Sequence, residues 1–288
     1  MRNYLIKTLK EFKYDQACAD EVIKCFDKIK NKKDITKFVS QYKDTNYDHR
    51  KVLKEFEDYI KKKYKINTYI SSLMFSLLLT KKARELYKKH HYSYQFFYDT
   101  FIDIKWKAIE CKLVKHTWGT FVAWWFDDYF CLRRFSFGRL QFEWTHFEKK
   151  YQDEHIHLTP DMRAVYVHIP RNGQKLEPTL VKDSINRAIK FFRPYFNNGP
   201  ILFKCESWIM YPQTIKFLNK DSNMMKFVKL FKIYGYSVDK DQSEMWRLFD
   251  NDVSDLSQLE AHTSLTIKYL NYLKKGGKVG EGFGFFIA

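Results

Sequence analysis

The sequence predicts a mixed α/β (α+β) protein in which a helical domain precedes a largely antiparallel sheet flanked by helices. In the first part of the chain, apolar residues recur at three- and four-residue spacing, the period of an amphipathic helix. Near residue 116 the pattern changes to short aromatic and β-branched runs bounded by glycines, which is typical of strands joined by turns. We therefore expect two domains, a helical one at residues 1–115 and an α/β one at residues 116–288.

The first domain is expected to be a helical bundle. Val52, Phe56 and Ile60, for example, fall on one side of a helix. Asp20 and Asp34 stand near expected helix starts, where a side-chain oxygen can cap free backbone amides. The predicted helices span residues 5–13, 17–30, 34–42, 48–64, 66–80 and about 94–110.

The second domain is expected to alternate strands with helices. AVYVHI, for example, is a short β-branched run of the kind that forms a buried strand, and Gly276-Gly277 is an ordinary helix stop. The predicted strands lie within residues 117–137, 138–147, 164–169, 201–210, 244–250 and 282–288, and the predicted helices at 179–193, 213–219, 222–229 and 263–275.

The net charge of +17 suggests an anionic partner such as nucleic acid or a membrane surface. The excess, however, is mostly lysine scattered over helical faces, as in KKDITK and YIKKKYK, and not an arginine-rich stripe with interleaved aromatics. A solvated lysine surface is therefore favoured over nucleic-acid binding. A basic groove for an anionic cofactor explains part of the charge equally well.

The five cysteines have no CxxC or other metal-type spacing, and EHIH at residues 154–157 lacks further ligands. An odd number of unpaired cysteines indicates free thiols in a reducing compartment. The N-terminal stretch has no long apolar run, and LMFSLLL is far too short to cross a membrane. We expect a cytoplasmic protein without a membrane span or a metal.

Polar and apolar residues alternate in the stretch FSFGRLQFEW at residues 135–144. A strand here puts Arg139, Gln141 and Glu143 on one face and apolar groups on the other. This polar face either meets water, with Arg139 and Glu143 as an ion pair, or lines a site.

The segment VHIPRNGQKLEPTLVKDSINRAIKFF at residues 167–192 predicts a buried strand, a loop and an amphipathic helix. The amino end of a helix presents free N–H groups and a partial positive charge, which stabilise a phosphate. Gly173 permits close approach of the backbone to a ligand, and Arg171 could pair with phosphate oxygens. Arg171, Asn172 and Gly173 therefore form either an anion site or a plain turn.

Six stretches occur in an informative order: GRLQFE (138–143), HIPRNGQKL (168–176), SINRAIKFF (184–192), CESW (205–208) with Pro212, DSNMMKF (221–227) and the terminal KKGGKVGEGFGFF. In this order they resemble the bacterial acyltransferase-domain proteins that pair an N-terminal acyltransferase domain with a GNAT-like C-terminal domain. The resemblance is strong from about residue 116 to the end and looser over the helical part.

The resemblance implies a GNAT-like fold in which acyl-coenzyme A, as a substrate, lies between two strands that splay apart. On this sequence those strands are 164–169 and 201–210, and the pyrophosphate loop is 171–173. The implied reaction moves an acyl group directly to an amine of a small-molecule acceptor, for which the amine must lose a proton and the departing thiolate must gain one.

The candidate catalytic residues are Glu143 and His168 as bases, Tyr211 as the acid and Ser207 in the second of these strands; Arg139 and Gln141 are the candidate substrate-binding residues. Each has a structural alternative. A histidine that ends a buried strand is often structural, and Cys205, beside Ser207 in sequence pattern, fits a small buried hydrophobe better than a nucleophile.

A second function is left open by the sequence. The stretch PRNGQKLEP has one glycine, whereas the acetyltransferase loop R/Q-x-x-G-x-G/A has a second glycine or an alanine. This departure favours a GNAT-like module without catalysis that binds a small acyl or nucleotide ligand or a protein partner. Serine-hydrolase, P-loop, zinc-protease and dinucleotide motifs are absent from the sequence.

Overall fold

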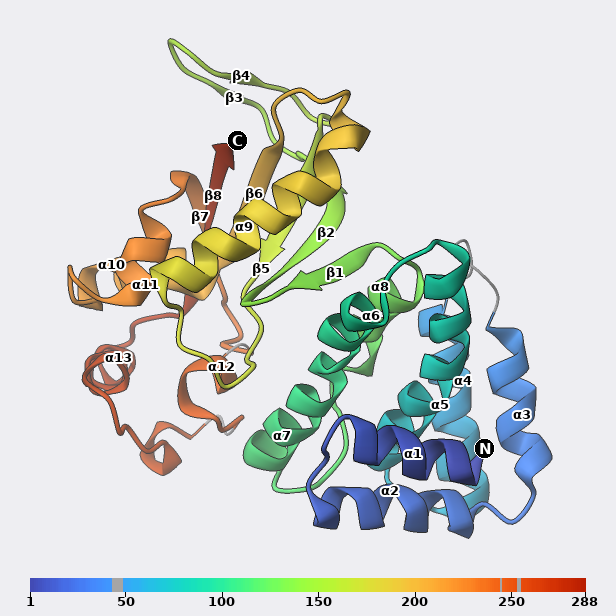
Figure 1. The fold of residues 1–288 in the computed structure, drawn as a ribbon. Coiled ribbons are helices and arrows are strands. Elements are labelled where there is room, and N and C mark those ends of the chain that lie inside the picture. The colour runs from blue at the N-terminus through green and yellow to red at the C-terminus, as the bar shows by residue number, and fades with distance from the viewer. Residues whose placement is uncertain (43–48, 244, 253–254) are drawn as a thin grey trace. The chain divides into compact units, whose positions relative to one another are not determined.

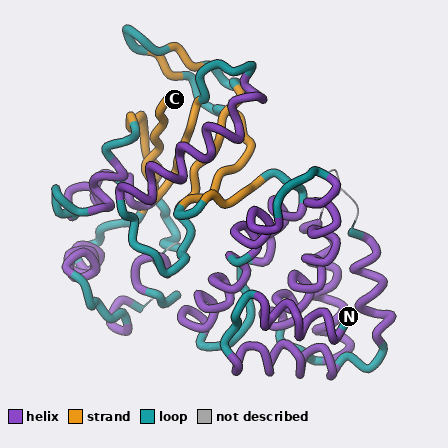
Figure 2. The backbone as a smooth tube through the Cα atoms, viewed as in Figure 1, coloured by secondary structure: helices purple, strands orange, loops and turns teal. Residues whose placement is uncertain are grey.

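The computed structural model describes residues 1–42, 49–243, 245–252 and 255–288. The chain divides into two compact units, Met1–Phe135 and Ser136–Ala288. Helices dominate the first unit, and the strands gather in the second (Figure 2). The sequence places this boundary earlier, between residues 115 and 116, ahead of two short helical turns that contact the first unit.

The first unit is a helical bundle around one fully buried helix segment. Its elements are α1 (Arg2–Glu11), α2 (Gln16–Lys28), α3 (Lys32–Gln41), α4 (His49–Tyr64), α5 (Thr68–Lys89), α6 (Tyr94–Phe101), α7 (Asp103–Lys115), η1 (Ala123–Phe126) and α8 (Asp127–Phe130). Residues 70–80 of α5 are all buried, and α5 contacts each of the other helices named here. Ser76 can be buried there because its hydroxyl donates to the Ser72 carbonyl, 2.8 Å away. Among the described residues, none of the helices combines the length and the hydropathy that crossing a membrane requires.

Two predicted strands are wrong. Of the run 117–137, only β1 (Arg134–Phe137) is a strand, because Asp127 and Asp128 open α8 and pair with Arg133 and Arg134. The expected strand at 244–250 is instead the short helix α12 (Trp246–Phe249), with residue 244 outside the described residues. Trp246 is buried and Met245 belongs to a small apolar cluster, so packing and not strand pairing orders this segment.

The second unit is a six-stranded sheet with helices, in strand order β1-β2-β5-β6-β8-β7 (Figure 1). Its further elements are β2 (Leu140–His146), β3 (Tyr151–Gln152), β4 (His157–Leu158), β5 (Arg163–His168), α9 (Pro178–Phe192), η2 (Arg193–Phe196), β6 (Leu202–Ser207), η3 (Trp208–Met210), α10 (Pro212–Phe217), α11 (Asn223–Val228), β7 (Lys232–Val238), η4 (Leu256–Gln258), α13 (Ser264–Lys274) and β8 (Gly280–Ile287). The β2–β5, β6–β8 and β7–β8 pairs are antiparallel and the β5–β6 pair is parallel. The predicted α/β class with a largely antiparallel sheet is therefore confirmed, whereas strands β3, β4 and β7 are additional to the prediction.

The two faces of this sheet differ in chemistry. Helix α9 crosses one face (Figure 1), where Trp144 and Phe142 meet Phe192 and Phe137 through ring contacts. On the other face, β5 and β6 both begin apolar, with Ala164 and Leu202 in a buried cluster, and become polar toward their carboxyl ends. The period of two in strands thus separates a core face from a face that can hold polar groups.

Candidate functional site

The polar face joins Glu143 of β2 to His168 of β5. In the β2–β5 pair, Gln141 lies opposite His168 and Glu143 opposite Tyr166, so all four residues belong to the same face of the sheet. His168 Nε2 and Glu143 Oε2 are 2.8 Å apart, and the two side chains are 14% and 21% exposed. Two of the predicted bases are therefore a hydrogen-bonded pair that solvent still reaches.

A histidine held in this way is equipped to accept a proton. When Nε2–H donates to the Glu143 carboxylate, the lone pair of the neutral ring is on Nδ1. The carboxylate then orients the ring and stabilises the imidazolium that forms when Nδ1 takes a proton. Among the candidates, this geometry suits His168 for accepting a proton at Nδ1 and Glu143 for orienting its ring.

Tyr166 lies on the His168 ring, with the ring centroids 4.2 Å apart and an angle of 11° between the planes. Its hydroxyl donates to the Glu206 carbonyl at 3.3 Å. Burial, and then the charges of neighbouring acidic groups, raise the pKa of Tyr166, so the phenol stays protonated. Tyr166 therefore contacts the histidine as a neutral ring.

Lys204 of β6 lies opposite Tyr166 on the same face of the sheet. Its side chain is 2% exposed, and its Nζ is 3.2 Å from both Glu148 and Glu206 and 5.0 Å from the Tyr166 ring centroid. A buried ammonium needs such partners to remain charged. Sequence reasoning missed both Tyr166 and Lys204, although the alternation in AVYVHI puts Tyr166 on the face of His168.

Arg139 is not the partner of Glu143. Its guanidinium donates to the carbonyls of Pro170 (2.8 Å) and Lys175 (3.2 Å), at the two ends of the predicted phosphate loop. Burial lowers the pKa of Arg139 to about 10. The ion pair considered from sequence is therefore replaced by a clamp that holds the loop 170–175 against the start of β2.

The predicted phosphate loop is a tight turn. Asn172 Oδ1 accepts from the Gln174 amide at 3.2 Å, and Gly173 has a φ of +74°, which only glycine adopts without strain. Arg171 forms a two-pronged ion pair with Asp250, in which Nη2 and Oδ2 are 2.8 Å apart. An incoming phosphate would have to compete with this carboxylate for Arg171.

The β5–β6 ladder joins Val165 to Phe203 and Tyr166 to Lys204. Strand β5 continues to His168 and β6 to Ser207, but the described register does not extend to these ends. The described pairs thus lie in the middle of β5 and in the first half of β6.

The other two predicted catalytic residues have different surroundings. Ser207 Oγ accepts from the Ile209 amide at 3.4 Å and so caps η3. Tyr211 is buried beside Tyr236, with centroids 5.9 Å apart, and burial and Tyr272 raise its pKa. Within the described part of the chain, neither forms a hydrogen bond with Glu143 or His168. Cys205 is on the opposite face, and burial raises its thiol pKa far enough to keep it neutral.

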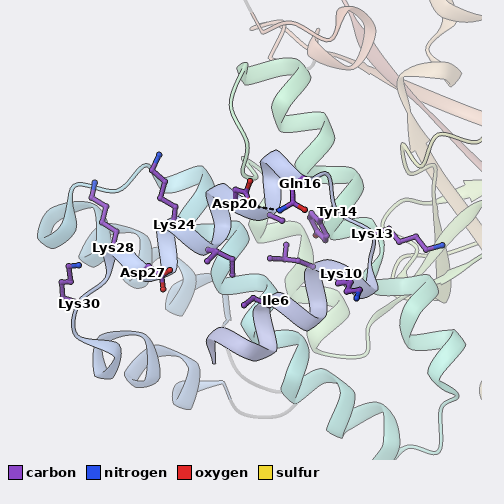
Figure 3. A pocket seen from close by; sticks show the side chains of 13 residues that line it. Ile6, Lys10, Lys13, Tyr14, Gln16, Asp20, Lys24, Asp27, Lys28 and Lys30 are labelled. Atoms are coloured by element: carbon purple, nitrogen blue, oxygen red, sulfur yellow. Dashed lines mark hydrogen bonds between the residues drawn. The ribbon is translucent and has the colours of Figure 1, made fainter.

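A groove of about 1070 Å³ lies on the first unit (Figure 3). Residues of α1 and α2 line it, with Ile6, Leu9 and Ile23 among the apolar ones and several lysines around them. Asp27 on this groove is held by Arg2 at 3.0 Å. The groove offers a basic, partly apolar surface but no acid–base pair of the kind found at His168.

The first unit also contains a buried cluster of His49, Asp127 and Cys131, whose potential ligand atoms lie within 4.8 Å of one another. Arg133 donates to the second oxygen of Asp127 at 2.7 Å. Burial raises the pKa of Cys131 to about 12, so the thiol is protonated. A guanidinium already neutralises the carboxylate, and we therefore interpret the cluster as an ion-pair network.

The comparisons with known proteins match both units. Residues 134–286 match the GNAT-like C-terminal domain family, and residues 3–132 match the N-acyltransferase N-terminal domain family. No curated protein matches the sequence.

Solved structures share the fold along almost the whole chain. One is an acyltransferase in complex with decanoyl-CoA and teicoplanin, with 16% identity, a TM-score of 0.70, and coverage of 97% of this chain and 86% of that one. Another is a mutant acyltransferase in complex with octanoyl-CoA, with 15% identity, a TM-score of 0.73, and coverage of 96% and 85%. At this identity the likeness is one of fold.

Proposed function

We propose that this chain, which belongs to the family of proteins with a GNAT-like C-terminal domain and an N-acyltransferase N-terminal domain, transfers an acyl group from acyl-coenzyme A to an amine. The observation that carries the proposal is the hydrogen-bonded Glu143–His168 pair on the polar face of the sheet, with His168 at the carboxyl end of β5. Two solved structures of similar fold are acyltransferases in complex with decanoyl-CoA and octanoyl-CoA, which supports an acyl-CoA donor here.

The reaction needs one proton acceptor on the protein. His168 Nδ1 takes a proton from the amine, and the nitrogen lone pair attacks the thioester carbonyl carbon. The carbon–sulfur bond then breaks, and the sulfur leaves with the bonding electrons. The proton passes from the imidazolium to the thiolate, directly or through water, which gives an amide and free coenzyme A. Glu143 keeps the imidazole oriented throughout.

Binding of the acyl donor is assigned to the carboxyl ends of β5 and β6 and the loop that follows β5. Arg171, Asn172 and Gly173 are the residues proposed to meet the pyrophosphate, with Arg171 exchanging Asp250 for a phosphate oxygen. Arg139 positions this loop through the carbonyls of Pro170 and Lys175. Gln141 contacts the acceptor, whereas Ser207 and Tyr211 remain weaker candidates because their contacts lie elsewhere.

The acceptor is proposed to be a small molecule that presents an amine. One of the similar structures holds teicoplanin beside decanoyl-CoA, and this supports a small-molecule acceptor here. All five cysteines are unpaired thiols, which fits the reducing, cytoplasmic compartment expected from their number.

A thermal melt with octanoyl-CoA tests the proposal first. At a ligand concentration ~100 times the dissociation constant, binding stabilises the folded state by about 2.7 kcal/mol and raises Tm by a few degrees. The variant Arg171→Ala with Gly173→Pro should lose the shift, since proline cannot adopt a positive φ. Absence of a shift in the wild type with any acyl-CoA would contradict an acyl-CoA site.

A second candidate function is a GNAT-like module that binds an acyl or nucleotide ligand without transferring it. The ion pair between Arg171 and Asp250 occupies the cation expected to meet phosphate, which favours the form of this alternative that binds an acyl group or a protein partner and not a nucleotide. Release of free coenzyme A thiol from octanoyl-CoA, measured with a panel of amines, separates the two. Binding without amine-dependent release would favour the module.

A further inference from the structure

Gln141 has a buried side-chain acceptor that the protein leaves unused. The residue is 1% exposed, and Oε1 has no hydrogen-bond partner among the described residues. Most buried polar side-chain atoms in folded proteins are paired, because an unpaired one loses its hydration without compensation. An orphaned carbonyl oxygen therefore indicates a donor that is missing from the free protein.

The position of this oxygen connects it with the candidate base. Gln141 is directly opposite His168 in the β2–β5 pair, and Glu143 is two residues further along the same face. Residues opposite one another in antiparallel strands have Cβ atoms about 5 Å apart. Glu143 and His168 are partly exposed, so solvent reaches the face one side chain away from Gln141.

The charge of this face favours a cation. Glu143 and Glu206 lie on it, and Glu206 and Glu281 are close enough to act electrostatically on Tyr166. The buried ammonium of Lys204 is shared between Glu206 and Glu148. The face of the candidate base thus carries the carboxylates of Glu143 and Glu206 against one ammonium, that of Lys204.

We propose that Gln141 Oε1 receives an N–H of the acceptor, which enters the site as an ammonium ion. The inference rests on the proposed acyl transfer and names the charge state and binding residue of its acceptor. The ammonium first loses one proton to His168 Nδ1, which passes it to solvent, because an ammonium nitrogen has no lone pair for the attack. The neutral amine then attacks the thioester carbon and gives a second proton to His168, which delivers it to the leaving thiolate. The third N–H remains in the amide product and is the one that donates to Gln141 Oε1. Gln141 is then a specificity-determining residue that selects charged amines over alcohols of the same shape.

The first test compares benzylamine with benzyl alcohol as binding probes, measured by saturation-transfer NMR without any turnover. We expect the wild type to bind benzylamine about tenfold or more tightly than benzyl alcohol. The difference should disappear in Gln141→Leu and persist in Gln152→Leu, a matched change on the exposed strand β3. If the wild type binds the two probes equally, or binds neither, the proposal is overturned.

Two further measurements on Gln141→Leu exclude other roles for the amide. Its Tm should equal or exceed that of the wild type, because leucine removes an unpaired buried acceptor. A Tm several degrees lower would mean that the amide is bonded in the free protein and would overturn the proposal. Its dissociation constant for octanoyl-CoA should be unchanged, and a loss of affinity there would assign Oε1 to an amide N–H of the acyl donor.

These outcomes are separable from those of the proposed function. Failure of acyl-CoA binding or of thiol release in the wild type counts against acyl transfer. Preferential binding of benzylamine that depends on Gln141 is measured without acyl-CoA, so it stands or falls independently.

Discussion

Among the described residues, two histidine–carboxylate pairs have the same 2.8 Å separation and different surroundings. In the first unit, His49 pairs with Asp127 at side-chain exposures of 6% and 8%, and Arg133 donates to the second Asp127 oxygen. In the second unit, His168 pairs with Glu143 at 14% and 21% exposure, on the sheet face that also carries Gln141. The buried His49–Asp127 pair, which an arginine neutralises, is suited to stabilising the fold. The His168–Glu143 pair is reached by solvent and lies beside the unpaired Gln141 Oε1, so it is suited to accepting and donating a proton.

The variant His168→Ala tests most directly whether the two pairs have different roles, and it has the largest expected effect. Removal of the proposed base should lower kcat for amine acylation by about 10²- to 10⁴-fold. The dissociation constant for octanoyl-CoA should be unchanged, and Tm should stay close to the wild type because His168 is partly exposed. Single-turnover thiol release measures the first quantity, and a kcat within twofold of the wild type would remove His168 from the mechanism.

Asp127→Asn should have the opposite effect: it should lower the stability of the fold and leave the activity unchanged. Loss of this buried negative charge removes the partner of His49 and one of the two carboxylates that hold Arg133, which keeps Asp128, so the free energy of unfolding should fall by about 1–3 kcal/mol. Turnover per folded molecule should stay at the wild-type level. Urea denaturation combined with an activity assay below the transition tests both parts, and a stable but inactive variant would contradict the structural role.

Acidification provides an independent check on Asp127. Burial alone would raise its pKa, but the hydrogen bond from His49 and the charges of His49, Arg133 and Arg50 lower it overall. A carboxyl with a lower pKa in the folded state stabilises the fold above its unfolded pKa of about 3.9 and loses this contribution as pH falls through the folded pKa. The wild type should therefore lose stability below about pH 4, and the loss should be smaller in Asp127→Asn.

A further prediction concerns Tyr166, whose ring stacks on His168. Replacing Tyr166 by leucine removes the ring stacked on His168 and should lower kcat about tenfold, with little effect on the KM for acyl-CoA. Tyr166→Phe keeps the ring, loses only the hydrogen bond to the Glu206 carbonyl and should retain most of the activity. Equal losses in both variants would assign the role to the hydroxyl instead.

The smallest expected effect concerns Asp250. Both Arg171 and Asp250 are 42% exposed, and such pairs contribute only about 0–1 kcal/mol. Asp250→Asn should therefore tighten octanoyl-CoA binding by no more than about fivefold, whereas Arg171→Ala should weaken it. Calorimetric titration distinguishes the two, and weaker binding in Asp250→Asn would contradict competition for Arg171.

The sequence-based predictions for residues 117–137 and for Arg139 failed for one reason: charged side chains found partners that the local pattern does not reveal. In FVAWWFDDYF, the aromatic residues suggest a strand, but Asp127 and Asp128 find arginines that stand six residues further along, and this favours the short helix α8. Arg139 and Glu143 have the spacing of an ion pair on a strand face. Arg139 instead turns to the carbonyls of Pro170 and Lys175, which no local pattern links to it.

The sequence by itself determined the features that depend on residues close to one another along the chain. Helical periodicity in the first unit specifies which side of each helix is buried, and the alternation in GRLQFEW specifies which residues share a face of the strand. The ordered motifs indicated the family. Only the tertiary structure decided which polar groups meet. The β2–β5 register puts Glu143 against His168 and leaves Gln141 without a partner, because pairing across strands depends on residues 25 or more positions apart.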